Sequence, residues 1–376
     1  MVKIGVVFGT RPEAIKMAPV VQKLKESQIW ETKIIVTGQH REMLDQVLRI
    51  FQIVPDYDLN IMAAGQSLTD ITVAILSGLS NIFQGWLPDY LFVHGDTTTT
   101  FAATLAGFYH KIPVAHVEAG LRTNSLTNPY PEEANRRLTD LLAELYFAPT
   151  EQAAANLRKE GIEENRIFVT GNTVIDALFS VVKADYQFKL PELRQLSFSK
   201  PIILATAHRR ENWGKPLEEI CQGLQKIAET YPVEIVFAMH KNPLVQQVVR
   251  KYLQNIDNVH LIDAPDYVEF ANLLSRCHFL VTDSGGLQEE AAALGKPVLV
   301  LRETTERPEG IEAGIIKLIG TRKERIVKEI SNLLIDQQLY DKMASAKNPF
   351  GDGTAALKIK QILEEYIKVR GVRDDD

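Results

Sequence analysis

The chain of 376 residues contains only two cysteines, Cys221 and Cys277, so no disulfide framework holds it together. No apolar run approaches the roughly 18–20 residues that a membrane-spanning helix requires. Residues 1–13 form a short apolar run that turns polar at once, without the longer apolar region and cleavage site of a signal peptide. We therefore expect a reduced, cytoplasmic, soluble protein that does not bind membranes.

An excess of positive charge is also missing. Lysine and arginine together number 42 against 48 aspartates and glutamates, which gives a formal net charge of −6. A protein that neutralises many phosphates needs concentrated positive charge, so this composition argues against a general nucleic-acid-binding function. Local basic clusters can still bind one small anion.

Two common nucleotide-binding motifs are absent as well. The first apolar run ends in Gly9-Thr10-Arg11-Pro12-Glu13, which is neither G-x-G-x-x-G nor G-x-x-x-x-G-K-[ST]. Nothing here indicates a nicotinamide or flavin cofactor, and a P-loop is excluded. Instead, Arg11 and Lys16 accompany a glycine turn at the start of a predicted helix, where free N–H groups and a bidentate guanidinium favour phosphate binding. A plain turn with a solvated Arg11 explains the same residues equally well.

Short Val- and Ile-rich runs alternate with segments of helical periodicity along the whole chain. Runs that are apolar on both faces suit buried parallel strands. They occur at Lys3–Phe8, Lys33–Thr37, Tyr90–His94, Val114–Val117, Leu145–Ala148, Pro201–Thr206, Glu234–Met239, His260–Ile262, Phe279–Thr282 and Pro297–Leu301. The predicted helices include Ala14–Lys25, Thr97–His110, Leu217–Thr230 and Val268–Arg276. This repeated alternation predicts an α/β protein.

The length and the alternation together predict two doubly wound Rossmann-like domains that face each other across a cleft. We place the N-terminal domain at residues 1–170 and the C-terminal domain at residues 171–354, because the aperiodic stretch Phe179–Ser199 separates two series of strands. We expect a C-terminal helix at about 355–370 to pack back on the first domain. Ligands of such folds bind at the carboxyl ends of strands, so the polar residues that follow each strand are the candidates for function.

Two strand ends of the first domain carry histidine and carboxylate two residues apart. His94 precedes Asp96, and His116 precedes Glu118. Because residues two apart in a strand share a face, we expect the members of each pair to point together. Such pairs permit a metal site, and equally acid–base chemistry without metal. A purely structural alternative is that Asp96 caps the helix that follows it.

Two carboxylates open the predicted helix that follows Pro131. The helix dipole alone explains acidic residues in a first turn, and this structural interpretation is strong for Glu133. Glu132 is therefore the better functional candidate of the two.

In the second domain, Ser284-Gly285-Gly286 follows a strand and precedes a helix. Glycines let backbone N–H groups approach a pyrophosphate, and an acid one turn into the helix, which carries Glu289 and Glu290, can hold ribose hydroxyls. An ordinary strand-to-helix turn explains the same residues. Two histidines, His208 and His240, also end strands in this domain, and His208 is followed by two arginines. A solvated basic loop is the alternative for that segment.

Together these strings resemble the non-hydrolysing UDP-N-acetylglucosamine 2-epimerases of bacteria over nearly the whole chain. In the first half the shared strings are Gly9–Pro19, Gln39–Asp45, His94–Thr99, Val117–Thr123 and Pro131–Arg136. In the second half they are Gly171–Asp176, His208–Asn212, Asp283–Glu290 and Thr304–Glu309. The resemblance implies the GT-B glycosyltransferase fold, a homodimer and the interconversion of UDP-GlcNAc with UDP-ManNAc, without metal or nicotinamide.

The resemblance also implies a role for each candidate residue. The acid–base candidates are Asp96, Glu118 and Glu132, with His208 near the diphosphate. The diphosphate would be held by Arg11, Lys16, Arg136 and the backbone N–H groups of Ser284, Gly285 and Gly286. In the C-terminal, UDP-binding domain, Glu290 would bind the ribose, Pro265 and Phe270 the uracil, and Arg307 would close the nucleotide pocket. No residue is expected to bind a metal.

The chemistry implied by the resemblance is an elimination followed by an addition. The C2 hydrogen of the sugar is not acidic because no carbonyl carbon adjoins it in the ring. Departure of UDP from C1 makes that hydrogen acidic, so elimination gives 2-acetamidoglucal and UDP. Re-addition of UDP, with protonation of C2 from the opposite face, inverts the centre.

Some members of the resembled family bind a second UDP-GlcNAc as an activator. The residues that match such an allosteric site are Gln39, His40, Gln66, Arg209 and His240. Glu42 and Gly65, however, stand where we expect Gln and Arg in those members, which argues against allosteric activation.

Four other functions remain open at this point. A hydrolysing epimerase of the same fold would release ManNAc and UDP, and a glycosyltransferase would need an acceptor site that the sequence does not reveal. A metal hydrolase could use the two histidine–carboxylate pairs, and a non-enzymatic UDP-sugar sensor would bind without turnover.

Overall fold

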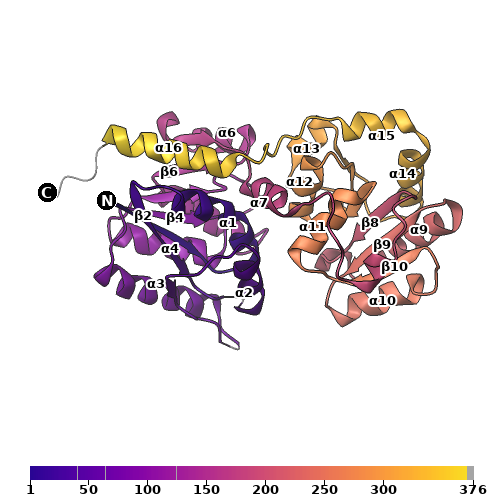
Figure 1. Cartoon of the computed structure of the whole chain (residues 1–376), viewed down its shortest axis with the longest axis horizontal. Coiled ribbons are helices and arrows are strands. Elements are labelled where there is room, and N and C mark those ends of the chain that lie inside the picture. Colours follow the sequence, from indigo (N-terminus) through magenta and orange to yellow (C-terminus); the bar gives the residue numbers. More distant parts are fainter. Residues whose placement is uncertain (40, 64, 124, 371–376) are drawn as a thin grey trace. The chain divides into compact units, whose positions relative to one another are not determined.

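The computed structural model describes residues 1–39, 41–63, 65–123 and 125–370. These residues form two compact units, each with its own parallel sheet (Figure 1). The N-terminal unit comprises Met1–Ala177 together with the return segment that begins at Gly351, and the C-terminal unit comprises Leu178–Phe350. The sequence instead places the domain boundaries after residues 170 and 354, and these boundaries stay predictions.

The sheet of the N-terminal unit has the strand order β3-β2-β1-β4-β5-β6-β7, with every pair parallel. Its strands are β1 (Val2–Phe8), β2 (Trp30–Val36), β3 (Tyr57–Asp58), β4 (Tyr90–His94), β5 (Val114–Val117), β6 (Leu145–Ala148) and β7 (Ile167–Val169). Its helices are α1 (Arg11–Lys25), α2 (Arg41–Ile50), α3 (Leu68–Gly85), α4 (Thr98–Tyr109), α5 (Glu132–Leu142), α6 (Glu151–Lys159), α7 (Thr173–Val181) and α16 (Ala355–Arg370), with a 3₁₀ turn at Glu164–Arg166. The chain order reverses between β1 and β4, which is the switch point at which such sheets bind ligands.

The sheet of the C-terminal unit has the order β10-β9-β8-β11-β12-β13, again with every pair parallel. Its strands are β8 (Ile202–Thr206), β9 (Glu234–Met239), β10 (Val259–Asp263), β11 (Phe279–Thr282), β12 (Val298–Val300) and β13 (Ile316–Leu318). Its helices are α8 (Pro191–Arg194), α9 (Lys215–Thr230), α10 (Pro243–Leu253), α11 (Tyr267–Arg276), α12 (Gly285–Ala293), α13 (Pro308–Ala313), α14 (Lys323–Ile335) and α15 (Gln337–Ala344), with a 3₁₀ turn at Arg210–Asn212. Here the switch point lies between β8 and β11.

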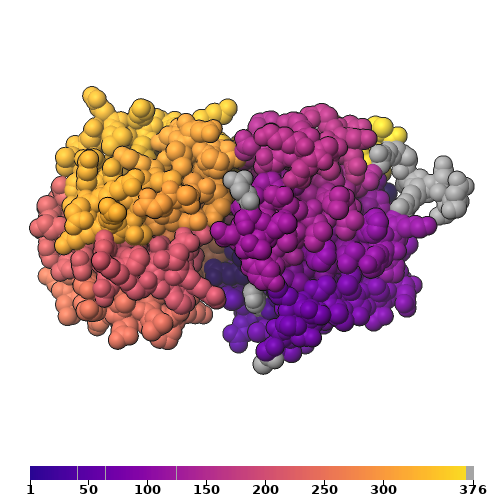
Figure 2. Space-filling model, turned by 180° about the vertical axis from the view of Figure 1, so that it is seen from behind, coloured from indigo at the N-terminus to yellow at the C-terminus, as the bar shows by residue number. Residues whose placement is uncertain are grey.

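Both sheets are buried on both faces, which explains their apolar sequences. The central strands β8 and β11 have no exposed residue, and apolar side chains of the C-terminal unit form one core cluster on each face of its sheet. Figure 2 shows the unit from the opposite side, where residues near 330–345 (yellow-orange) and residues near 215–255 (rose to salmon) form much of its visible surface. The predicted α/β class, with two doubly wound parallel sheets, is confirmed.

The last helix returns to the N-terminal unit, where α16 packs against α1 (Figure 1). The carboxylate of Asp176 accepts hydrogen bonds from the N–H groups of Ala355 (3.2 Å) and Ala356 (2.9 Å), which are otherwise unpaired at the start of α16. At the other end of the helix, the Tyr366 hydroxyl donates to Glu144 (2.9 Å). No helix in the described part of the chain has the length and apolar character that a bilayer span requires.

Candidate active site

The turn after β1 is built around a buried carboxylate. Glu13 Oε2 accepts hydrogen bonds from the backbone N–H groups of Gly9 (3.1 Å) and Thr10 (2.7 Å), and the capping box formed with Thr10 starts α1. Burial raises the pKa of Glu13, against the effect of these hydrogen bonds. A side chain at position 9 would lie 1.9 Å from the Thr37 hydroxyl, so only glycine fits this turn.

Arg11 lies directly after this turn, at the first residue of α1. Among the residues that the structure describes, its guanidinium has no hydrogen-bond or ion-pair partner. A guanidinium without an internal partner at a helix N-terminus is available to an anion. The geometry is therefore compatible with the phosphate-binding role inferred for Arg11.

Glu118, after β5, is the most constrained carboxylate of the N-terminal unit. Its backbone φ is +66°, in the left-handed region that a residue with a side chain rarely adopts. The side chain is 8% exposed and forms an ion pair with the Lys16 ammonium. Asn172 Nδ2 also donates to Glu118 Oε1 at 2.8 Å, and His94 Nε2 lies 3.6 Å from the other oxygen, Oε2. Three segments distant in sequence thus converge on one carboxylate.

His94, the last residue of β4, is fully enclosed. Its two ring nitrogens make no hydrogen bond within the described part of the chain. Burial lowers the pKa of His94 to about 3, although the neighbouring Glu118 opposes this effect. The ring is therefore neutral near pH 7, and it presents one nitrogen to Glu118 without a net charge.

The expectation that His116 points with Glu118 is wrong. His116 Nδ1 lies 2.6 Å from Asp140 Oδ1, and His116 Nε2 lies 2.8 Å from the backbone oxygen of Gly95. Asp140 also pairs with Arg122 at 2.7 Å. Burial would raise the pKa of Asp140, but His116 and Arg122 outweigh it and the pKa is lowered. The strand alternation fails because β5 ends at Val117 and the positive φ of Glu118 turns the chain.

His94 and Asp96 also point to different partners. The Asp96 carboxylate contacts the Arg136 guanidinium, and its backbone oxygen accepts from Asn135 Nδ2 at 3.0 Å. Arg136, from α5, also binds Glu133 Oε2 at 2.7 Å. The histidine and the carboxylate of each pair therefore contact different partners, which does not support the metal site considered for them. No group of three or more potential metal ligands is found among the described residues.

The two adjacent carboxylates of α5 differ in their hydrogen bonding. Glu133 is buried and holds structure together: it accepts from the Thr123 N–H at 3.0 Å and from Arg137 Nε at 2.7 Å. Glu132 Oε2, by contrast, is buried without a hydrogen-bond partner in the described chain. An unpaired buried carboxylate oxygen is costly, so it is typical of a group kept for a function. The contact between Arg136 and Asp96 joins α5 to the turn that contains Gly95. That turn lies close to Glu118, because a Cβ atom at Gly95 would be 3.4 Å from Glu118 Oε2.

In the C-terminal unit, one aspartate organises the switch point. Asp283, fully buried after β11, accepts from the N–H groups of His208 (2.9 Å) and Arg209 (2.9 Å) and from Asn212 Nδ2 (2.9 Å). His208 Nδ1 lies 2.9 Å from its other oxygen. Burial would raise the pKa of Asp283, but these partners outweigh it and the pKa is lowered. The aspartate thereby fixes His208, whose side chain is 40% exposed, by its Nδ1 edge.

The Ser284–Gly286 segment begins α12 without a side-chain cap. The Ser284 N–H donates to Thr282 Oγ1 at 3.0 Å, whereas the N–H groups of Gly285 and Gly286, in the first turn of α12, remain available to an anion. A side chain at Gly286 would meet no atom within 4 Å, so the space in front of this turn is open. The geometry is that expected of a phosphate-binding turn.

The loop before α13 is tied to α12 by polar contacts. Thr305 Oγ1 donates to Gln288 Oε1 at 2.8 Å, and Arg307 forms an ion pair with Glu289. Glu290, on the same helix, is 7% exposed. Arg307 thus lies beside the helix that carries the proposed ribose ligand.

The proposed uracil-binding residues follow β10, an edge strand of the sheet of the C-terminal unit. Pro265 is half-buried between β10 and α11, and Asp266 caps that helix by accepting from the Glu269 N–H at 2.8 Å. Phe270, in the first half of α11, packs against the apolar core.

Four of the residues inferred for an allosteric site contact neighbouring residues of the protein. Gln39 Oε1 accepts from Thr99 Oγ1 at 3.2 Å, and Gln66 Nε2 donates to the Ile61 carbonyl at 2.6 Å. Arg209 lies 3.4 Å from Glu306, and the His240 ring stacks on His208 with centroids 6.1 Å apart. His40 lies outside the described residues.

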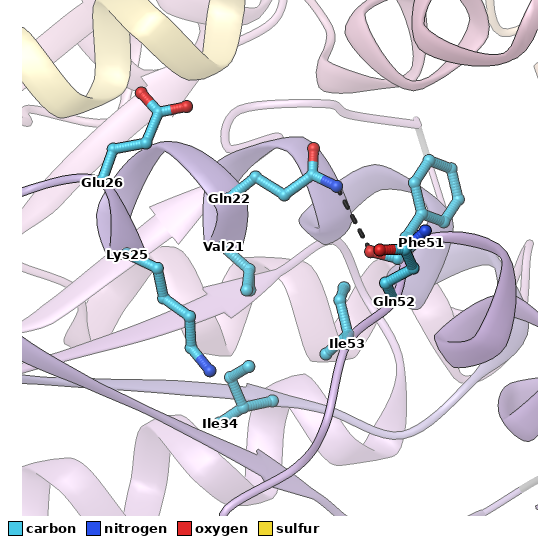
Figure 3. Close-up of a pocket in the computed structure, with 8 residues that line it drawn as sticks. All are labelled: Val21, Gln22, Lys25, Glu26, Ile34, Phe51, Gln52 and Ile53. Atoms are coloured by element: carbon cyan, nitrogen blue, oxygen red, sulfur yellow. Dashed lines mark hydrogen bonds between the residues drawn. The ribbon is translucent and has the colours of Figure 1, made fainter.

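A separate hollow of about 280 Å³ lies on the N-terminal unit beside α1 (Figure 3). It is lined by four apolar and four polar or charged residues, with the Lys25 side chain extending toward Ile34 and Gln22 hydrogen-bonded to the Phe51 carbonyl at 3.3 Å. None of the candidate site residues lines it, so this hollow is not the candidate active site.

Sequence reasoning missed four residues that organise the candidate site. They are Glu13, Asp140, Asn172 and Asp283, which bind backbone groups or other side chains at the strand ends. Asn172 and Asp283 each follow a strand, so strand-end position was a usable signal for both. Asp140 lies within α5 and carried no such signal.

Comparisons with known proteins agree with this geometry. Residues 22–364 match the model of a family described as UDP-N-acetylglucosamine 2-epimerase. The chain is 52% identical over 373 residues to the UDP-N-acetylglucosamine 2-epimerase of Yersinia pestis, covering 97% of this chain and 99% of that protein.

Solved structures are similar over the whole length. The UDP-GlcNAc 2-epimerase of Neisseria meningitidis, bound to UDP-GlcNAc, has a TM-score of 0.88 and 47% identity, covering 96% of this chain and 100% of that one. The UDP-GlcNAc 2-epimerase of Methanocaldococcus jannaschii, in complex with UDP-GlcNAc and UDP, has a TM-score of 0.79 and 36% identity, covering 96% of this chain and 99% of that one.

Proposed function

The chain belongs to the UDP-N-acetylglucosamine 2-epimerase family, and from this premise we propose that it interconverts UDP-GlcNAc and UDP-ManNAc without hydrolysis. The observation that carries the chemistry is the set of carboxylates on adjoining segments of the N-terminal unit. Glu118 is held in a strained conformation, Asp96 is paired with Arg136, and Glu132 keeps a buried oxygen unpaired.

The proposed reaction begins with departure of UDP. The C1–O bond breaks with its electron pair leaving on the β-phosphate, and a carboxylate removes the proton from C2, so that a C1–C2 double bond forms. The 2-acetamidoglucal and UDP remain bound. A second carboxyl group then protonates C2 from the opposite face while the phosphate oxygen rebonds to C1. Asp96, Glu118 and Glu132 are the groups proposed for these proton transfers.

Charge that accumulates on the leaving diphosphate must be stabilised. We assign this role to Arg11, Lys16, Arg136 and the N–H groups of the Ser284–Gly286 turn, with His208 beside the diphosphate. Lys16 and Arg136 are ion-paired with Glu118 and Asp96 in this structure. A phosphate therefore competes with a carboxylate for each of these two cations, which links leaving-group charge to the charge on the acid–base groups.

The nucleoside contacts are assigned to the C-terminal unit. Glu290 binds the ribose, Pro265 and Phe270 contact the uracil, and Arg307 covers the nucleotide. Support comes from the open N-terminal turn of α12 and from the contacts that hold the Arg307 loop to that helix.

One experiment tests the proposed reaction directly. The protein is incubated with UDP-GlcNAc in deuterated water, without added metal or NAD, and the products are analysed by NMR. We expect both epimers as UDP-sugars, with deuterium at C2. Free ManNAc with UDP would instead identify a hydrolysing epimerase, and turnover without deuterium would exclude proton transfer at C2.

A homodimer and a cytoplasmic location complete the proposal. Exposed apolar residues gather on the neighbouring helices α3, α4 and α5, and they include Val73, Phe108, Tyr109, Leu138 and Leu141. Such a group of apolar side chains is typical of an interface between subunits. Phe108→Glu should convert a dimer to a monomer, which light scattering would detect.

A further inference from the structure

The string Gly171–Asp176 matches the resembled family, yet no role follows for it from the sequence. In the structure its second residue, Asn172, is 3% exposed and lies between β7 and α7. The nitrogen and the oxygen of the Asn172 side-chain amide both form hydrogen bonds. Nδ2 donates to Glu118 Oε1 at 2.8 Å, and Oδ1 accepts from the Val174 N–H at 3.1 Å, which fixes the orientation of the amide.

The same string also holds the returning end of the chain. Asp176 binds the first N–H groups of α16, as described above. Gly351, just before that helix, has φ +128°, and a side chain there would lie 3.3 Å from the Asn172 backbone nitrogen. The return segment therefore packs directly against the residue that contacts Glu118.

Glu118 needs such support because its own backbone does not favour its position. A residue other than glycine at φ +66° is held there by its surroundings. The charged and titratable groups placed against its carboxylate are Lys16 from α1 and His94 from β4. His116 from β5 is paired with Asp140 instead. Asn172 Nδ2, at 2.8 Å, is a neutral hydrogen-bond donor to the Glu118 carboxylate.

We propose that Asn172 is a positioning residue that orients the Glu118 carboxylate for proton transfer and favours its ionised form. This inference rests on the proposed acid–base role of Glu118. A donor aimed at a carboxylate oxygen stabilises the charged form over the neutral one. It also restricts the carboxylate to one direction, and misplacement of a reacting group by about 1 Å can cost roughly a hundredfold in rate.

The test uses Asn172→Asp and Asn172→Ala, with Thr173→Val as the matched control. Asn172→Asp keeps the size of the side chain and the acceptor for Val174, but replaces the donor by a second carboxylate oxygen. The Thr173 hydroxyl is buried without a partner among the described residues, so its replacement by a methyl group changes the same segment without touching Glu118. The rate constant kcat is measured against pH from both UDP-GlcNAc and UDP-ManNAc, and UDP affinity is measured by calorimetry.

We expect kcat of both Asn172 variants to fall roughly ten- to a hundredfold, with UDP affinity unchanged. One limb of the pH profile should move to higher pH by about one unit, and further for Asn172→Asp. The direction of the shift is the same from either substrate. If Glu118 is a base in one direction and an acid in the other, weaker stabilisation of its charged form moves either limb upward. Thr173→Val should match the unmodified protein.

An unchanged pH profile in a folded Asn172→Asp protein would overturn the inference, as would a loss of rate that Thr173→Val shares. Gly351→Ala provides a second route, because it displaces Asn172 from the backbone side and should shift the same limb. Glu118→Gln separates the two proposals. If that variant keeps its turnover, the role of Glu118 is wrong, whereas an inactive Glu118→Gln with unaltered Asn172 variants refutes only the positioning role.

Discussion

The two units use the carboxylates at their strand ends in opposite ways. In the N-terminal unit, Glu118 and Asp96 are paired with the side chains of Lys16 and Arg136. In the C-terminal unit, Asp283 binds two backbone N–H groups as well as the Asn212 and His208 side chains, and the glycine turn that follows it has no side-chain cap. Side-chain pairs can exchange partners when a ligand arrives, whereas backbone contacts hold a loop in place. The first arrangement suits proton transfer and the second suits anion binding.

The largest effect expected from breaking this contrast is on turnover. Asp96→Asn and Glu118→Gln each remove an ionisable group, and we expect kcat to fall at least about a thousandfold, at the upper end of what one general acid or base contributes. UDP affinity, measured by calorimetry, should not fall, because Lys16 and Arg136 remain and lose only a competing carboxylate. Glu160→Gln, which changes an exposed partner of Arg122, is the matched control and should be fully active. A parallel loss of UDP affinity would count against a proton-transfer role.

The complementary change in the C-terminal unit should reduce stability as well as binding. Asp283→Ala leaves the buried N–H groups of its loop without an acceptor, so we expect the free energy of unfolding to fall by about 2–4 kcal/mol. His208 also loses its Nδ1 contact, and UDP should bind more weakly. Denaturant unfolding and calorimetry measure the two effects. Asp283→Asn keeps one acceptor oxygen, so its free energy of unfolding should lie between those of the unmodified protein and Asp283→Ala. Equal stability of all three proteins would contradict the role assigned to Asp283.

Gly286→Ala separates the folding of the Ser284–Gly286 turn from its proposed role in binding the diphosphate. The added methyl group meets no protein atom within 4 Å, so thermal stability should be unchanged. It occupies the space through which a phosphate would approach the N–H groups, and we expect roughly tenfold weaker UDP binding, equivalent to about 1.4 kcal/mol. Unaltered affinity would place the diphosphate elsewhere.

The smallest expected effect concerns acid stability. Burial would raise the pKa of Glu306, but Arg302 and Arg209 outweigh it and lower the pKa from its ordinary 4.5 to about 2. A depressed pKa contributes stability above pH 4.5 that is lost as the pH falls toward 2. Glu306→Gln should flatten the decline of unfolding free energy across that window by about 1 kcal/mol, after allowance for solvent screening. Denaturant titrations at several pH values would show this, and an unaltered slope would contradict it.

Much of the fold follows from apolar runs in the sequence, because the central strands are buried on both faces. The strands that the runs did not reveal are β3, β7 and β13, which lie at the edges of the sheets. Their residues are partly exposed, as in Ile167–Val169, so they carry no continuous apolar signal. Each of them is also only two or three residues long, whereas the edge strand β10, with five residues, was revealed by its run at His260–Ile262.

The sequence allows a candidate residue to be proposed where a polar residue directly follows a predicted strand, as for Asp96, Glu118 and His208. Prediction failed where geometry departs from the ideal strand, since the turn at Glu118 sends His116 to Asp140 instead. The contact between Asn172 and Glu118 joins residues 54 positions apart, and no local pattern encodes it. Long-range pairing of polar groups is thus the part of the site that only the folded structure reveals.

The N-terminal unit is assembled from both ends of the chain, and this has a consequence for biosynthesis. During translation, every residue of the C-terminal unit is synthesised before α16. The half-buried carboxylate of Asp176 can bind its two N–H partners only after residues 355 and 356 have been made. The unit that begins first is therefore completed last, and a premature stop codon ahead of α16 would damage the opening half of the protein rather than its closing half.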